Sequence, residues 1–215
     1  MAALPMFPLG TVLVPGMVLP LHVFEPRYQQ LVQDCLAAPE PEFGVVLIER
    51  GSEVGGGDVR TDVGTVARIL RADRLSGGRV ALATAGVRRL RVARWLDDDP
   101  YPRAEVEDWP DGDDDPATTA AAREALAPGG EVVALLRRGA ALLTELGEAS
   151  VPVDVALADD PVLASYQAIA VAPLGVLDRQ ALLAAPTAGA RAARLAELLP
   201  GALELLEARL AGGGE

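Results

Sequence analysis

The sequence predicts an α+β chain in which a small β-barrel with one inserted helix, residues 1–115, precedes an α-helical bundle, residues 116–215. Three observations support this fold class. Short apolar runs separated by glycine and proline turns fill the first hundred residues, a pattern typical of small barrels. Beyond residue 121 the apolar period becomes 3.6, which indicates amphipathic helices. Between these parts, residues 108–121 contain proline, glycine and five aspartates and predict a linker or exposed loop.

The first half contains several predicted strands and one helix. Residues 43–48 form a continuous apolar run, which predicts a strand buried on both faces. A turn at 76–78 predicts a hairpin between residues 63–75 and 80–85, and Gly86 marks the start of a further strand, 87–96. Pro26 suits the first turn of the inserted helix, because side chains at helical spacing follow it: Tyr28, Leu31, Val32 and Cys35.

The second half predicts four or five short helices around one apolar interior. One stripe places Gly139 on the same face as several apolar residues: Val132, Leu135, Leu136, Leu142, Leu143 and Leu146. Asp160 followed by Pro161 is typical of a helix start, and Asp178 and Thr187 are predicted as further N-caps. Pro200 and Gly201 are expected to break or kink the last helix.

Composition excludes whole classes of chemistry. All 19 basic residues are arginine, so this chain can form neither a P-loop, nor a Schiff base, nor a serine-lysine dyad. With one histidine, His22, and one cysteine, Cys35, we expect no disulfide, no metal site of nitrogen and sulfur ligands and no cofactor. No serine lies in a Gly-x-Ser-x-Gly motif. We therefore predict no catalytic residue, with a hydrolase using carboxylates or Ser165 as the least favoured alternative.

The uncharged start of the chain does not predict a signal peptide or a membrane span. It has no basic segment, and a continuous helix could not pass its breaks at Pro5, Pro8, Gly10, Pro15, Gly16 and Pro20. We expect a cytoplasmic protein that does not contact a membrane.

The tetrapeptide Glu25-Pro26-Arg27-Tyr28 holds two charges at the predicted junction of strand and helix. Glu25 and Arg27 could bind the charged end of a ligand, with Tyr28 as an aromatic wall. We favour a structural corner formed by Glu25, Pro26 and Arg27, because such a pair can satisfy backbone groups and fix the direction of the helix.

The strands of the first half are rich in arginine. Eight arginines lie between residues 68 and 94, and ten acidic residues follow between 97 and 115. The simpler interpretation is that the two segments lie close together in the sheet, so that the arginine and carboxylate charges neutralise each other. The alternative is an RNA-binding face that uses Arg88, Arg89 and Arg91. A net charge of −12 disfavours nucleic acid as a partner, since binding of phosphates requires positive potential.

Several motifs resemble the Lon protease N-terminal substrate-binding domain. The strongest are Phe7-Pro8-Leu9-Gly10, then Pro15-Gly16, then the run from Leu19 to Tyr28. Further along, Phe43-Gly44-Val45, residues 63–67 and the glycine-arginine strand 86–92 are similar to the same family. In the helical half, residues 178–183 followed by Arg191 resemble the segment where the family's bundle closes.

The resemblance implies a PUA-like β-barrel, or pseudobarrel, followed by a helical bundle. It also implies that the two together recognise protein substrates. The full protease adds an ATPase and a serine-lysine peptidase, whose motifs need lysine, so we expect a stand-alone, non-catalytic protein-binding or peptide-binding module. Its expected partners are unfolded or extended polypeptides and a protease or other protein, and it would be a monomer or homodimer. Phe24, Tyr28 and Tyr101 are the candidate peptide-binding residues.

Overall fold

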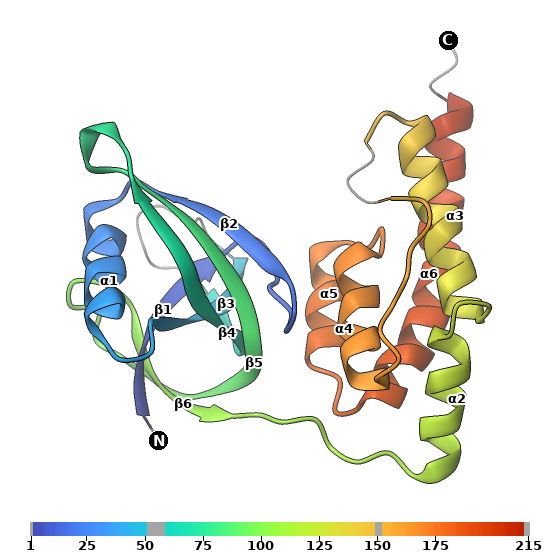
Figure 1. Ribbon diagram of the computed structural model, residues 1–215, viewed down its shortest axis with the longest axis horizontal. Coiled ribbons are helices and arrows are strands. Elements are labelled where there is room, and N and C mark those ends of the chain that lie inside the picture. Colours follow the sequence, from blue (N-terminus) through green and yellow to red (C-terminus); the bar gives the residue numbers. More distant parts are fainter. Residues whose placement is uncertain (1, 51–58, 149–151, 213–215) are drawn as a thin grey trace. The chain divides into compact units, whose positions relative to one another are not determined.

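The structure is a computed structural model that describes residues 2–50, 59–148 and 152–212 (Figure 1). The chain forms two compact units, residues 1–110 and 111–215. The division falls within the aspartate-rich segment 108–121, after Pro110 and earlier than the expected boundary at residue 115. Its physical reason is that the aspartates after Pro110 bind residues of the helical unit, as described below.

The first unit is a six-stranded mixed sheet with the order β2-β5-β4-β3-β1-β6, in which β6 also pairs with β5. The β1–β3 pair is parallel and all other pairs are antiparallel. The pairings from β5 through β4, β3, β1 and β6 back to β5 close a ring of five strands. Strand β2 pairs with β5 outside this ring, so the sheet is a pseudobarrel rather than a clean barrel. The strands are β1 (Ala2–Leu9), β2 (Val18–Val23), β3 (Glu42–Arg50), β4 (Val59–Arg74), β5 (Val80–Leu96) and β6 (Arg103–Asp108).

One helix, α1 (Pro26–Ala37), covers part of the sheet and confirms the inserted helix. Its buried residues are the four predicted from their spacing: Tyr28, Leu31, Val32 and Cys35. The Tyr28 ring stacks on Phe7 of β1, with ring centroids 4.0 Å apart and an interplanar angle of 7°. Strand β3 is buried over its first six residues, which confirms the strand predicted at 43–48.

The two strands expected on either side of Gly86 are one continuous strand, β5, so that expectation is wrong. Gly86 is needed for a close approach of the chain rather than for a break. A Cβ atom there would lie 2.4 Å from the carbonyl oxygen of Val14. The Gly86 N–H donates to the Met17 carbonyl, and its own carbonyl accepts from Gly16, so the segment before β2 is bound at this point.

The second unit contains five helices among its described residues. They are α2 (Pro116–Leu126), α3 (Glu131–Glu145), α4 (Pro161–Val171), α5 (Val176–Leu183) and α6 (Ala188–Gly212). Helix α2 was not predicted, because residues 116–121 were assigned to the linker. Asp115 caps it by accepting the N–H groups of Ala117 and Thr118, and Pro116 occupies its first turn. The same pair of residue types, Asp160 and Pro161, starts α4 as predicted.

Two of the other helix predictions need correction. Asp178 lies within the first turn of α5, whose N-cap is Gly175, so its predicted capping role is wrong. Pro200 does not break α6, which is continuous through it, while the alternative of a kink stays a prediction. Thr187 does cap α6, since its hydroxyl accepts the Ala190 N–H at 3.1 Å. The stripe on α3 packs on the second half of α6, where Leu142 meets Leu203 and Leu206.

A buried ionic network closes the helical unit. The side chain of Arg191 on α6 is completely buried and forms a salt bridge with Asp111. Its Nε donates to the Ser165 hydroxyl at 2.8 Å, and its guanidinium lies 4.1 Å from the ring centroid of Tyr166. The Tyr166 hydroxyl donates to the other carboxylate oxygen of Asp111 at 2.8 Å. Asp114 accepts the N–H of Gly189 at 2.7 Å, so two linker aspartates hold α6.

Candidate functional site

Strand β2 is the one strand in the described part of the barrel unit with a neighbour on a single side. It pairs with residues 80–85 of β5 alone, whereas β5 pairs with three strands and each of the others with two (Figure 1). The side chains of Leu19 and Val23 are buried, while those of Val18, Pro20 and His22 are exposed. An edge strand of this kind presents unpaired backbone groups to which another extended chain can bind.

Pro20 indicates which backbone groups face the open edge. Proline has no N–H and is tolerated in a strand where its nitrogen points away from the partner strand. Leu19 is oriented the other way, because its carbonyl accepts the Thr84 hydroxyl of β5 at 2.8 Å. Hydrogen-bonding direction alternates along an antiparallel strand. The N–H and carbonyl groups of Val18 and His22 therefore point to the open side.

An exposed phenylalanine follows this strand. The side chain of Phe24 is 58% exposed, although neighbouring apolar residues are buried. It borders a cavity of about 180 Å³ that residues of β1, β2 and α1 line, among them Leu9, Leu21 and Tyr28. Pockets for whole small ligands are larger, about 300 to 1,000 Å³. This cavity is therefore suited to one or two apolar side chains rather than to a cofactor.

The corner after Phe24 is fixed by contacts within the chain. Arg27 Nε donates to Glu25 at 3.0 Å, and its guanidinium lies 4.6 Å from the Tyr28 ring centroid. The Glu25 carbonyl accepts the N–H groups of Tyr28 and Gln29, and the Gln29 side chain donates to the Phe24 carbonyl at 3.0 Å. These contacts hold the exposed Phe24 backbone at the start of α1. They lie at the junction of β2 and α1, and the role of Glu25, Pro26 and Arg27 as a structural corner stays a prediction.

The three candidate peptide-binding residues occupy different environments. Phe24 is on the surface, whereas Tyr28 is 4% exposed and contributes its ring to the wall of the cavity. Tyr101 is buried, and its hydroxyl donates to Asp34 of α1 at 2.7 Å. Burial, together with this hydrogen bond, raises the pKa of Tyr101 to about 12. Tyr101 therefore does not line the cavity beside Phe24. Its hydrogen bond joins the segment before β6 to α1.

The arginines of the alternative RNA face bind within the barrel unit. Arg88 donates to Glu42 at 2.7 Å and to Asp108 at 2.9 Å. Arg89 is only 3% exposed, so its side chain is not presented to a phosphate group. The guanidinium groups of Arg89 and Arg91 lie 4.3 and 4.5 Å from the ring centroid of Trp109. These contacts favour the simpler interpretation of neutralised strands, and RNA binding stays a prediction.

Glu42 and β6 supply the neutralising carboxylates. Glu42 is buried and accepts from Arg68 at 2.6 Å as well as from Arg88. On β6, Glu105 pairs with Arg94 at 2.6 Å. The hydrogen bond from Arg94 lowers the pKa of Glu105. The sequence indicated this neutralisation for the acids after residue 97 but gave no reason to assign Glu42, which is distant in sequence.

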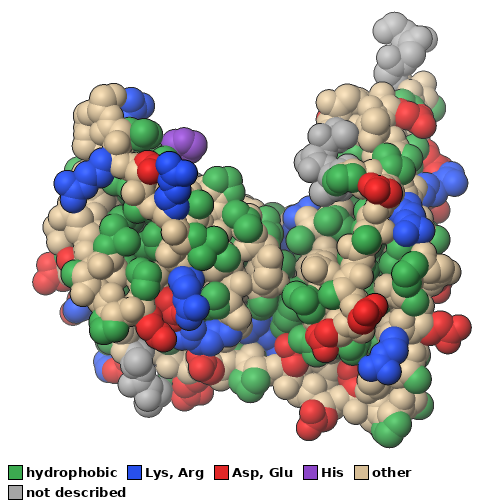
Figure 2. All heavy atoms as spheres, in the orientation of Figure 1, with side chains coloured by type: hydrophobic (Ala, Val, Ile, Leu, Met, Phe, Trp, Pro, Cys, Tyr) green, Lys and Arg blue, Asp and Glu red, His purple; other side chains and the backbone are tan. Residues whose placement is uncertain are grey.

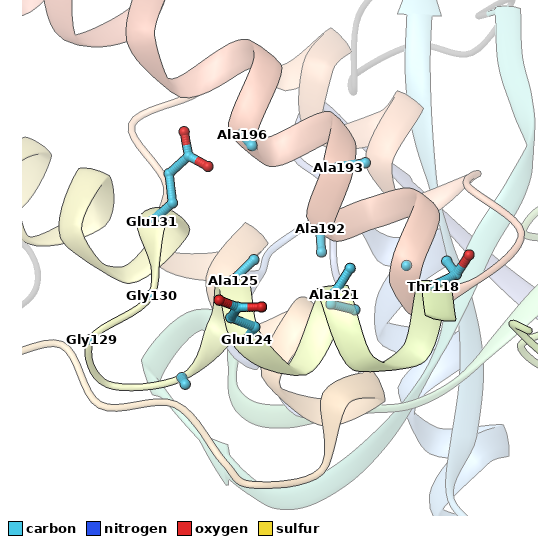
Figure 3. A pocket seen from close by; sticks show the side chains of 13 residues that line it. Thr118, Ala121, Glu124, Ala125, Gly129, Gly130, Glu131, Ala192, Ala193 and Ala196 are labelled. Carbon is cyan, nitrogen blue, oxygen red and sulfur yellow. The ribbon is translucent and has the colours of Figure 1, made fainter. Parts of the chain in front are cut away.

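A second hollow lies within the helical unit. A cavity of about 670 Å³ is bordered by α2, the start of α3 and α6 (Figure 3). Alanine and glycine form most of its wall, and the charged groups there are the carboxylates of Glu124 and Glu131. This wall contains neither a nucleophile with a base nor a set of metal ligands. The cavity is large enough for a small ligand, but its wall does not offer the side chains of a catalytic site.

Two further properties of the described residues bear on the class of protein. Within residues 2–50, 59–148 and 152–212, no three histidine, cysteine, aspartate or glutamate residues are grouped so that they could hold a metal ion. No helix in these ranges is both long enough and apolar enough to cross a membrane. The features that remain are the open β2 edge and its small apolar cavity. They belong to an α+β domain whose sheet has one open strand edge beside a small apolar cavity.

The particular family follows from comparison with known proteins. Residues 3–200 match the ATP-dependent protease La (LON) substrate-binding domain, and the chain belongs to this family. It is 35% identical over 109 residues to the Lon protease of Anaeromyxobacter dehalogenans, covering 49% of the chain and 13% of that relative. It is 26% identical over 208 residues to Lon protease 1 of Herpetosiphon aurantiacus, covering 93% and 24% respectively. The chain therefore spans only a small part of these curated relatives.

Solved structures agree with this assignment. The Lon N-terminal domain protein from Xanthomonas campestris superposes with a TM-score of 0.60 at 29% identity, covering 93% of this chain and 98% of that one. The N-terminal domain of the Mycobacterium avium complex Lon protease has a TM-score of 0.65 and the same coverage. At 18% identity, the second likeness shows the fold alone. The match to Lon N-terminal domains confirms both the resemblance and the fold class predicted from the sequence.

Proposed function

We propose that this chain is a polypeptide-binding module without catalytic activity of its own, which binds extended apolar segments of unfolded proteins. The observation that carries the proposal is the open edge of β2 next to the exposed Phe24 and its cavity. Membership of a family described as substrate-binding supports the same function.

Binding would occur by strand addition. The outward backbone groups of Val18 and His22 would pair with an incoming segment, and main-chain hydrogen bonds of this kind give affinity with little dependence on sequence. Every second side chain of the segment would face the cavity beside Phe24. The module would therefore prefer extended segments with an apolar residue and would not bind the same residues in a folded protein.

The absence of catalysis rests on the residues of this chain. It contains no lysine for a serine-lysine dyad or a P-loop. Its one histidine, His22, lies exposed on β2. The module would act in the cytoplasm, either by presenting polypeptides to a protease or by binding another protein partner.

The test uses a fluorescein-labelled, carboxymethylated protein that cannot refold, and fluorescence anisotropy measures its binding. We expect Phe24→Ala to weaken binding by about fivefold to thirtyfold, since burial of part of a phenylalanine contributes about 1 to 2 kcal/mol. Leu70→Ala is the matched control, because Leu70 is 59% exposed on β4 and does not line the cavity. Its effect should stay below twofold.

Hydrogen exchange on the same samples locates the site. Added polypeptide should slow exchange in peptides that contain Val18 and His22. Sedimentation without polypeptide shows whether a second copy of the chain covers the β2 edge, as a homodimer would. No binding by a folded monomer, or equal loss with Phe24→Ala and Leu70→Ala, would contradict the proposal.

A further inference from the structure

A second groove on the barrel unit, which the residues of the β2 cavity do not line, combines exposed leucines with arginines. It lies between α1 and the turn that joins β4 to β5, which Figure 1 shows beside each other, and its volume is about 240 Å³. Leu36 on α1 and Leu75 in the turn line it and are 50% and 41% exposed. Large apolar side chains gathered in an exposed hollow indicate a binding surface more often than isolated ones do.

The charged groups of this groove are two arginines, Arg74 and Arg79. Other arginines of β4 are paired: Arg68 with Glu42 and Arg71 with Asp73. Among the described residues, Arg74 has no carboxylate partner, and Arg79 donates to a backbone carbonyl of the turn, at 3.3 Å. Both are exposed, so their guanidinium groups can reach a bound chain.

The local charge is opposite to that of the whole protein. The chain has a net charge of −12, yet no acidic residue lines this groove. Figure 2 shows acidic side chains on the visible surfaces of both units, which makes a positively charged hollow distinct. Complementary charge selects partners and speeds their encounter, while apolar contacts in a pocket supply most of the affinity.

We propose that this groove binds an acidic polypeptide segment that carries a leucine-like side chain. The apolar side chain lies between Leu36 and Leu75, and flanking carboxylates pair with Arg74 and Arg79. Gln33 on α1 also lines the groove and provides an amide group for the backbone of the segment, whereas the Gln29 amide beside it donates to the Phe24 carbonyl. The groove selects for composition, whereas the β2 edge selects for extended conformation.

The test measures fluorescence anisotropy of a labelled peptide, Gly-Glu-Leu-Asp-Leu-Glu-Asp-Gly, with the full chain. Two control peptides replace the acidic residues by lysine or the leucines by serine. The acidic, leucine-containing peptide should bind at least tenfold more tightly than either, and the affinity should fall as salt rises from 50 to 300 mM. Equal binding of the three peptides, or no binding of the first, overturns the proposal.

Substitutions test whether the acidic peptide binds in the groove. Arg74→Glu combined with Arg79→Glu should weaken binding of the acidic peptide at least tenfold. Arg71→Glu is the matched control on the same strand, since Arg71 is exposed and does not line the groove, and it should change binding less than twofold. Leu36→Ala should weaken binding without any change of charge. An equal effect of Arg71→Glu would show general electrostatic attraction and overturn the site.

The same variants separate this proposal from the one for β2. Phe24→Ala should leave the binding of the acidic peptide unchanged, and the double arginine variant should retain hydrogen-exchange protection of β2 by the carboxymethylated protein. Loss of both activities in either variant would overturn the independence of the two sites.

Discussion

Removal of the Asp111 carboxylate should strongly destabilise the helical unit. Arg191, its partner, is 0% exposed and cannot recover water when Asp111 is lost. Loss of one partner of a buried ion pair costs about 3 to 5 kcal/mol, because the other charge stays buried without compensation. The Tyr166 hydroxyl also loses its acceptor, which adds to the cost. We therefore expect Asp111→Ala to lower the free energy of unfolding by at least about 3 kcal/mol.

Urea unfolding can follow the two units separately. Both tryptophans, Trp95 and Trp109, belong to the barrel unit, so their fluorescence reports on that unit. Far-ultraviolet circular dichroism at 222 nm reports chiefly on the five helices of the other unit. With a urea dependence of about 2 kcal/mol per molar, the circular dichroism midpoint of Asp111→Ala should fall by about 1.5 to 2.5 M. The fluorescence transition should move much less.

A double variant tests the cause of this loss. Arg191→Met removes the stranded charge and keeps an apolar side chain in its place, and apolar replacement of a whole buried pair is often neutral. Asp111→Ala with Arg191→Met should therefore recover at least half of the stability lost in Asp111→Ala. The reasoning is refuted if Asp111→Ala costs less than about 1 kcal/mol, or if the double variant is less stable than the single one.

Two further predictions concern the barrel unit. Burial raises the pKa of Cys35 and of Tyr101 to about 12, above their values in an unfolded chain, so the folded state retains protons that the unfolded state loses. Stability should thus fall as pH rises from about 9 to 12, and Tyr101→Phe should reduce this slope above about pH 10 in urea titrations. Gly86→Ala should lower the free energy of unfolding, followed by tryptophan fluorescence, by roughly 1 to 3 kcal/mol because its Cβ would meet the Val14 carbonyl. Gly201→Ala, in open space on α6, should not destabilise, and a loss there equal to that of Gly86→Ala would contradict the steric reason.

Local patterns could be read correctly wherever a few consecutive residues determine the conformation. Pro26 and the apolar spacing after it predict α1, since helical periodicity depends on neighbours three and four residues apart. Asp160 with Pro161 predicts the start of α4, because an N-cap side chain and a proline in the first turn both act on the first residues of a helix. The start of α2 has an equivalent pair, Asp115 and Pro116, and it was missed because the surrounding aspartates indicated a linker.

The site could be predicted only in part. The sequence placed Phe24 and Tyr28 close together at a corner, but an alternating apolar pattern does not show which strand lies at the edge of a sheet. That depends on pairing between residues about sixty positions apart, such as Leu19 and Thr84. Tyr101 was grouped with them by residue type, although Asp34 holds it elsewhere. The groove lined by Leu36, Leu75, Arg74 and Arg79 likewise forms only where α1 meets the turn after β4.

The sequence by itself determined the α+β class, the change of period between the two halves, the inserted helix and the lack of any lysine for a P-loop or a serine-lysine dyad. These depend on composition and on short-range spacing, which are read directly from the order of residues. Only the tertiary structure decided that β5 runs unbroken through Gly86, that β2 is left with an open edge, and that Asp111 is the partner of Arg191. Each of these joins segments distant in the chain, because burial and pairing are properties of the folded contacts rather than of any local pattern.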